Sequence, residues 1–72
     1  MKKLSEEQQT ILQAIDNFIE KMGYSPSVRE LCKITGRNSP ATIQYHLRNL
    51  KQMGYINYNE KQSRTIRIIR KG

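Results

Sequence analysis

Residues 27–54 read SVRELCKITGRNSPATIQYHLRNLKQMG, and this stretch decides the fold of the chain. Ser27 followed three residues later by Glu30 is a capping box, in which each side chain satisfies an unpaired amide of the other residue at a helix start. The helix that this box opens should end at Gly36, because glycine takes the left-handed conformation of a helix end without steric penalty. The first half of the stretch therefore predicts a short, capped helix.

A second helix is expected to begin almost at once, with Ser39 as its N-cap. Pro40 suits the first turn, because the amide hydrogen that a proline lacks has no partner at that position. Gly54 is expected to end this helix, which covers about residues 39–53. Two helices joined by so short a turn predict a helix-turn-helix, whose second helix enters the DNA major groove.

The 39–53 helix has two chemically different sides, since successive residues are rotated by about 100°. The side predicted to face the core contains Ile43, Leu47 and Leu50, with His46 and Met53 at its edge. The opposite side combines small, amide, aromatic and cationic residues without a carboxylate: Ala41, Thr42, Gln44, Tyr45, Arg48 and Gln52. Such a side can approach a polyanion.

The flanking segments supply the rest of the fold. Ser5 and Gln8 form another capping box, and apolar residues at helical spacing before Gly23 predict a first helix. Its apolar stripe, expected to be core rather than a partner-binding groove, consists of Ile11, Leu12, Ile15, Phe18, Ile19 and Met22. Residues 55–58 and 64–69 are rich in β-branched and aromatic side chains and predict two short strands around a polar turn at 59–63. The expected fold is a single domain over residues 1–72, mainly α with a small β-hairpin: a winged helix-turn-helix.

Charge is distributed unevenly along the chain. The 72 residues carry a formal net charge of +7. Residues 1–30 hold five acidic and four basic side chains, whereas residues 31–72 hold nine basic side chains against Glu60 alone. A basic half that coincides with the candidate reading helix is the electrostatic footprint of a nucleic-acid binder.

The composition favours a binding module over an enzyme. Cys32 is the single cysteine, so no internal disulfide is possible and a cytoplasmic location is expected. We expect its side chain to pack in the core. Lys2 and Lys3 precede polar residues, which argues against a signal peptide, and no segment is long enough for a membrane span. His46 has no second histidine, paired cysteine or facing carboxylate, so we expect it at the core edge. Without a nucleophile–base pair or a phosphate-cradling glycine loop, no enzymatic activity, cofactor, metal or small-molecule substrate is expected.

Two groups of side chains are candidates for DNA contact, and both also fit an ordinary solvated surface. Gln44 can pair in two places with adenine, Arg48 can reach guanine or a phosphate, and Tyr45 can pack on a thymine methyl group or donate to a phosphate. The basic residues of the hairpin can contact phosphates, or can be edge charges that discourage association between sheets. This second group consists of Lys61, Arg64, Arg67 and Arg70.

Short motifs of one family occur along nearly the whole chain without an obvious gap. They are LS at 4–5 with QQ at 8–9, GYSPSVREL at 23–31, SP at 39–40, HL at 46–47, and Leu50, Gly54 and Ile56. With these motifs the chain resembles the N-terminal DNA-binding domain of the LexA-type repressors of the bacterial SOS response. The resemblance implies sequence-specific binding to a half-site of a double-stranded DNA operator, and transcriptional repression by excluding polymerase from it.

The resemblance also implies which residues face the DNA. Base contacts are expected from the start of the third helix, at Ser39, Ala41, Thr42, Gln44 and Tyr45, to which Arg48 is added as a neighbour on the same side. Phosphate contacts are expected from the helix-turn-helix and the wing, at Ser27, Arg29, Arg37, Asn38, Lys51, Lys61, Arg64 and Arg67. Enterobacterial members typically carry Asn at position 41 and Glu at positions 44 and 45, so their operator does not transfer to this chain.

Other functions and assemblies remain open at this point. The main alternative is a winged-helix protein-interaction module, such as an anti-repressor or adaptor, whose basic half meets an acidic protein. RNA binding is disfavoured, because the chain lacks an aromatic stacking platform. Family members continue into a dimerising domain with a Ser/Lys dyad that cleaves an Ala-Gly bond, and no residue here is assigned to that chemistry. The chain is thus either a piece of a longer repressor or a small stand-alone protein.

We expect the isolated chain to be a monomer. The apolar side chains left over from the core, chiefly Tyr24, Ile34 and Tyr45, are too scattered for a stable interface of ~800 Å² per partner. Two copies are expected to pair on palindromic DNA or through a further C-terminal domain.

Overall fold

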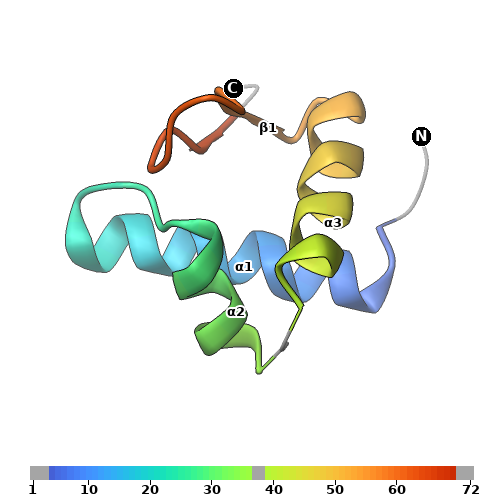
Figure 1. Ribbon diagram of the computed structural model, residues 1–72, viewed down its shortest axis with the longest axis horizontal. Helices are drawn as coiled ribbons and strands as arrows, with labels where there is room; N and C mark the ends of the chain where they lie inside the picture. Colours follow the sequence, from blue (N-terminus) through green and yellow to red (C-terminus); the bar gives the residue numbers. More distant parts are fainter. Residues whose placement is uncertain (1–3, 37–38, 70–72) are drawn as a thin grey trace.

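The computed structural model describes residues 4–36 and 39–69, and Figure 1 shows three helices with a small hairpin beside them. The elements follow in the order α1 (Glu6–Met22), α2 (Val28–Thr35), α3 (Pro40–Gln52), β1 (Ile56–Asn57) and β2 (Arg67–Ile68). Helix α2 packs against both α1 and α3, and β1 packs against α3. The predicted winged helix-turn-helix is confirmed.

Each helix begins at the residue that the sequence predicts. The hydroxyls of Ser5 and Ser27 accept hydrogen bonds from the backbone amides of Gln8 and Glu30, and both capping boxes are complete. Ser39 caps α3 through the Thr42 amide at 3.4 Å. At the far ends, left-handed glycines close α1 and α2, with φ of 80° at residue 23 and 72° at residue 36. The local signals alone therefore fix the ends of α1 and α2.

The core combines side chains from all three helices and from the hairpin. Its fully or nearly buried members are Ile11, Ile15, Leu31, Ile43, Leu47, Leu50, Ile56 and Ile66. Cys32 is half-buried and packs against this cluster, in partial agreement with the expected packing role. Met22 departs from the predicted stripe and is 48% exposed, because α1 ends there and the chain turns away at the following glycine. The core therefore holds the wing and the reading helix to the same scaffold.

The hairpin strands are shorter than predicted. The antiparallel ladder pairs Ile56 with Ile68 and Asn57 with Arg67, and each strand has only two residues. Arg64 has a φ of 59°, so the backbone is not extended where the second strand was expected to begin. The predicted strands at 55–58 and 64–69 were thus too long, and most of the wing is a loop.

His46 lies on the inner side of α3 and is 8% exposed. Its Nε2 atom is 3.2 Å from Oε2 of Glu7 on α1, so the expectation that no carboxylate faces this histidine was wrong. Glu7 was missed because it is distant in sequence and belongs to the first turn of another helix. The contact joins the buried side of α3 to α1 and leaves the opposite side of α3 facing outward.

No helix within the described parts of the chain combines the length and the apolar character needed to cross a bilayer.

Candidate nucleic-acid interface

The outward side of α3 presents the side chains that the sequence assigns to base contact. Ser39, Ala41, Gln44, Tyr45 and Arg48 are exposed, and Thr42 is half-buried. Tyr45 is 60% exposed and its ring meets the His46 ring edge-on, with centroids 5.3 Å apart. No acidic residue occurs along α3. The geometry therefore leaves one side of this helix free to approach a negatively charged surface.

A groove of about 530 Å³ runs between the start of α2, the outward side of α3 and the wing. Its polar and charged walls include the N-cap Ser27 and Arg29 at the start of α2, Gln44 and Arg48 from α3, and Lys61 and Arg64 from the wing. Among the described residues, Glu60 is the one acidic residue in this lining, so the charged lining is mainly basic. Residues predicted to contact bases thus lie beside residues predicted to contact phosphates, although they are far apart in the chain.

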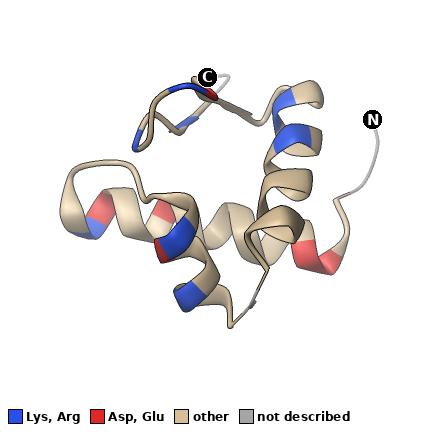
Figure 2. Ribbon diagram, in the orientation of Figure 1, with Lys and Arg blue, Asp and Glu red and all other residues tan. Residues whose placement is uncertain are grey.

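Acidic and basic residues are distributed unevenly over the elements, as the coloured ribbon of Figure 2 shows. Most of the acidic residues lie on α1, whereas the basic residues of the described chain, apart from Lys21 in the last turn of α1, occur on α2, on the second half of α3 and along the wing. Glu60 on the wing and Glu30 at the start of α2 are the acidic exceptions among the described residues after α1. Basic residues therefore outnumber acidic ones on the elements around the groove, which favours the approach of a polyanion.

The wing loop is organised around the hydroxyl of Thr65. This oxygen accepts a hydrogen bond from the Asn59 amide at 2.8 Å and lies 3.2 Å from the carbonyl oxygens of Asn59 and Gln62. The Asn59 side chain in turn accepts a hydrogen bond from the Lys61 amide at 2.9 Å. These bonds take the place of a longer backbone ladder and hold exposed Lys61 at the tip of the loop.

The arrangement of a capped helix-turn-helix, an outward α3 and a basic wing matches a known family. The sequence model of the family described as LexA DNA binding domain matches residues 1–65 of this chain. The chain belongs to the LexA DNA-binding domain family. It is therefore a DNA-binding domain.

Several curated relatives resemble this LexA-family domain along nearly its whole length. The LexA repressor of Thermosipho melanesiensis is 41% identical over 71 residues, which cover 99% of this chain and 35% of that protein. The LexA repressor of Shouchella clausii is 39% identical over 72 residues, and that of Carboxydothermus hydrogenoformans is 33% identical over 66 residues. These alignments cover 100% and 92% of this chain, and 35% and 32% of the relatives. The chain thus spans about a third of the length of the curated relatives it matches.

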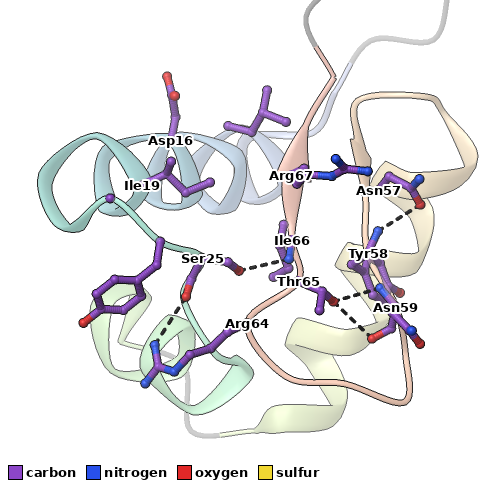
Figure 3. A pocket seen from close by; sticks show the side chains of 13 residues that line it. Asp16, Ile19, Ser25, Asn57, Tyr58, Asn59, Arg64, Thr65, Ile66 and Arg67 are labelled. Atoms are coloured by element: carbon purple, nitrogen blue, oxygen red, sulfur yellow. Dashed lines mark hydrogen bonds between the residues drawn. The ribbon is translucent and has the colours of Figure 1, made fainter.

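Not every basic side chain of the LexA-family domain lines the groove. Lys51, near the end of α3, donates a hydrogen bond to the Tyr58 carbonyl at 3.1 Å, and its Nζ lies 4.8 Å from the Tyr58 ring centroid. Burial raises the pKa of the Tyr58 phenol, the charge of Glu60 adds to this rise, and Arg48 opposes it. Arg67 lines a different hollow, of about 780 Å³, between α1 and the wing (Figure 3). Lys51 and Arg67 therefore lie outside the groove.

The remaining predicted phosphate contacts fall into two groups. Arg29 and Lys61 are exposed beside the groove, and the Ser27 hydroxyl is already an acceptor for the Glu30 amide at 3.2 Å. Arg37, Asn38 and Arg70 lie outside the described residues. Among residues 4–36 and 39–69, no three His, Cys, Asp or Glu side chains gather in a way that could hold a metal ion.

Sequence reasoning missed the role of Glu30 as a partner of the wing. Nη1 of Arg64 donates to Oε1 of Glu30 at 2.6 Å and to the Ser25 carbonyl at 3.3 Å. The pKa of Glu30 lies below its ordinary value because its carboxylate accepts the Ser27 amide and, second, the Arg64 guanidinium. The two residues are 34 positions apart, and the only local signal at Glu30 was its place in the capping box.

Proposed function

We propose that this domain binds one half-site of a double-stranded operator and acts as the DNA-reading part of a transcriptional repressor. The observation that carries the proposal is the outward side of α3, which lacks a carboxylate and forms one wall of the basic groove. The relatives it matches are named LexA repressors, which supports the assignment to repression. Repression then follows from occupancy, because a bound operator is closed to polymerase.

Base contacts are proposed for the N-terminal half of α3. Gln44 is exposed and its amide can donate and accept at the same time, which suits the N6 and N7 edge of adenine. Arg48 lies one turn further along, where it can reach guanine or a phosphate. Ala41, Thr42 and Ser39 are small and allow the helix to approach closely, while Tyr45 offers an aromatic surface to a thymine methyl group.

Phosphate contacts are proposed for the basic residues around α3. The described candidates are Arg29, Arg48, Lys51, Lys61 and Arg67, whereas the Arg64 guanidinium is already held by Glu30 and the Ser25 carbonyl. Each neutralised phosphate contributes about −0.9 to the slope of log K against log salt, so the full set would give a slope of roughly −5.

The proposal is tested by selection from a randomised duplex pool, followed by titration at about 50 mM and 200 mM salt. We expect one enriched consensus and a weaker, strongly salt-dependent binding to random duplex. A pool that shows no enrichment, together with salt-independent binding, would reject DNA reading and favour the protein-interaction alternative.

Each chain is proposed to read a half-site as a monomer. Among the described residues, the exposed large apolar side chains are spread over all three helices, the connection after α1 and the end of the wing: Met22, Tyr24, Ile34, Tyr45 and Ile69. So scattered a set does not favour a stable interface of the usual size of ~800 Å² per partner. Fusing an unrelated dimerisation domain after Gly72 should therefore tighten binding to a palindrome through effective concentration and hardly change binding to a lone half-site. A tight dimer of the unfused chain in sedimentation would contradict the monomer.

A further inference from the structure

Arg64 makes the densest set of tertiary contacts of any basic side chain in the wing loop. Besides its bonds to Glu30 and to the Ser25 carbonyl, its guanidinium carbon lies 5.1 Å from the centroid of the Tyr24 ring. Tyr24 is itself held edge-on against Phe18 of α1, with centroids 5.6 Å apart. The guanidinium is thus fixed by a carboxylate, a carbonyl and an aromatic face at once.

The same connection between α1 and α2 holds the wing a second time. The Ile66 amide donates to the Ser25 hydroxyl at 3.0 Å, and Ser25 is 7% exposed. Figure 3 shows Arg64 and Ile66 converging on Ser25 from the returning arm of the wing. Two neighbouring wing residues therefore depend on one short segment before α2 for their positions.

The backbone of Arg64 is also unusual. Its φ of 59° is the only positive value at a non-glycine residue in the described parts of the chain. The left-handed conformation is unfavourable for a residue with a Cβ atom, and it persists only where surrounding contacts determine it. The contacts with Glu30, Ser25 and Tyr24 are those contacts.

Glu30 calls for an explanation of its own, because a carboxylate beside a polyanion-binding groove is repulsive. Gln at this position would complete the capping box equally well, since Glu and Gln both serve there. The carboxylate differs from an amide in its negative charge, which interacts with the N-terminus of α2 and with the Arg64 guanidinium at 2.6 Å. The negative charge therefore serves the wing as well as the helix start, and Arg64 is its partner from the wing.

We propose that Glu30 and Arg64 form a positioning clamp that fixes the wing against the start of α2 in the orientation that binds DNA. Arg64 acts through the placement of the wing, and Lys61 at the tip carries the phosphate contact. This proposal rests on the proposed DNA-reading function. It goes beyond that function because Arg64, which its charge alone would assign to a phosphate contact, receives an intramolecular role instead.

The decisive variant is Glu30→Gln, for which a clamp and simple electrostatics predict opposite results. Removing a negative charge near the groove tightens DNA binding if charge alone matters. If the clamp positions the wing, fewer molecules of the variant hold the wing in the orientation that binds DNA. The apparent dissociation constant then rises in inverse proportion to that fraction of molecules. An exposed ion pair of this kind supports a loss of up to about fivefold.

The matched control is Glu20→Gln, which removes an exposed carboxylate from the last turns of α1. Arg64→Asn is the second variant, because asparagine tolerates the left-handed backbone but its short, uncharged side chain cannot take the place of the guanidinium. Dissociation constants are measured on the selected duplex at fixed salt. We expect Glu30→Gln and Arg64→Asn to bind more weakly than Glu20→Gln, and the double variant to be no weaker than Arg64→Asn alone.

Hydrogen exchange of the Ile66 amide in the DNA-free protein gives a readout that does not depend on DNA binding. Exchange should accelerate in Glu30→Gln and Arg64→Asn but not in Glu20→Gln. Binding by Glu30→Gln as tight as by Glu20→Gln, or unchanged Ile66 exchange, would overturn the clamp. If the unmodified domain does not bind the duplex at all, the proposed function fails, and the exchange experiment still decides whether the clamp exists.

Discussion

Replacing Gln44 with Ala should change which bases this domain prefers without changing its general attraction to DNA. Gln44 is exposed on the outward side of α3 and lines the groove. Alanine is the strongest helix former, so α3 should keep its conformation. Because the amide is uncharged, its removal should leave the salt dependence unchanged.

The expected magnitude follows from the geometry of a bidentate contact. A good pair between an amide side chain and adenine discriminates by about 1–3 kcal/mol. This range corresponds to roughly 5- to 150-fold weaker binding to the selected duplex. Binding to random duplex should stay the same, so the affinity for the selected duplex divided by the affinity for random duplex should fall by the same factor.

The assay is a titration of the selected duplex, of duplexes substituted at each position, and of random duplex. Gln13→Ala is the matched control, because Gln13 is exposed on α1 and donates to the Asn17 side chain at 3.0 Å, away from the groove. If Gln44→Ala selects the same consensus with the same affinity ratio as Gln13→Ala, then this side of α3 does not read bases.

Three further predictions concern the wing, the core and acid stability. Lys61→Gln should flatten the salt slope by about 0.9 for one lost phosphate contact, and an unchanged slope would place the loop tip away from the backbone. The Leu50 side chain has 0% exposure, so Leu50→Ala should lower the free energy of unfolding of the domain by about 2–5 kcal/mol. In thermal unfolding its Tm should fall by at least roughly 8 °C, and a smaller shift would contradict the place of Leu50 in the core. The pKa of Glu30 is below its ordinary value of 4.5, so its stabilising contribution is complete above that pH and is lost as the pH falls through the lowered pKa. Between roughly pH 5 and pH 2, the Tm of Glu30→Gln should therefore fall less than the Tm of the unmodified domain. If the two proteins lose Tm equally over this range, the ionisation of Glu30 does not contribute to stability.

The helices were predictable because their signals are local. A capping box spans four residues, and the apolar period of α3 places Ile43, Leu47 and Leu50 on one side without any knowledge of their partners. All three are buried, and the side opposite them is exposed except for the half-buried Thr42. The same period made the outward side of α3 predictable, whereas the base-contacting roles on that side were predicted from the family resemblance.

The wing was less predictable because its conformation depends on distant groups. Residues 64–69 have the composition of a strand, yet Arg64 turns out of the extended conformation and bonds to Glu30. Likewise, nothing near Lys51 in the sequence indicates that its ammonium group meets the Tyr58 carbonyl. Such pairs are decided by the packing of whole elements, and strand propensity is correspondingly sensitive to tertiary context.

The base of the wing is packed in the core, whereas its loop is held to the rest of the domain by polar contacts, and this difference indicates which part of the interface can move. Ile56 and Ile66 at the base of the wing are buried in the same cluster as Leu50 of α3, so the base of the wing and the reading helix move together. Beyond them, loop residues 58–65 are half-buried or exposed and are held mainly by hydrogen bonds from side chains such as Thr65. Polar contacts at an exposed loop open more easily than a packed core. The width of the groove therefore depends most on the few contacts that join this loop to α2, and a change there should alter DNA affinity before it alters the fold.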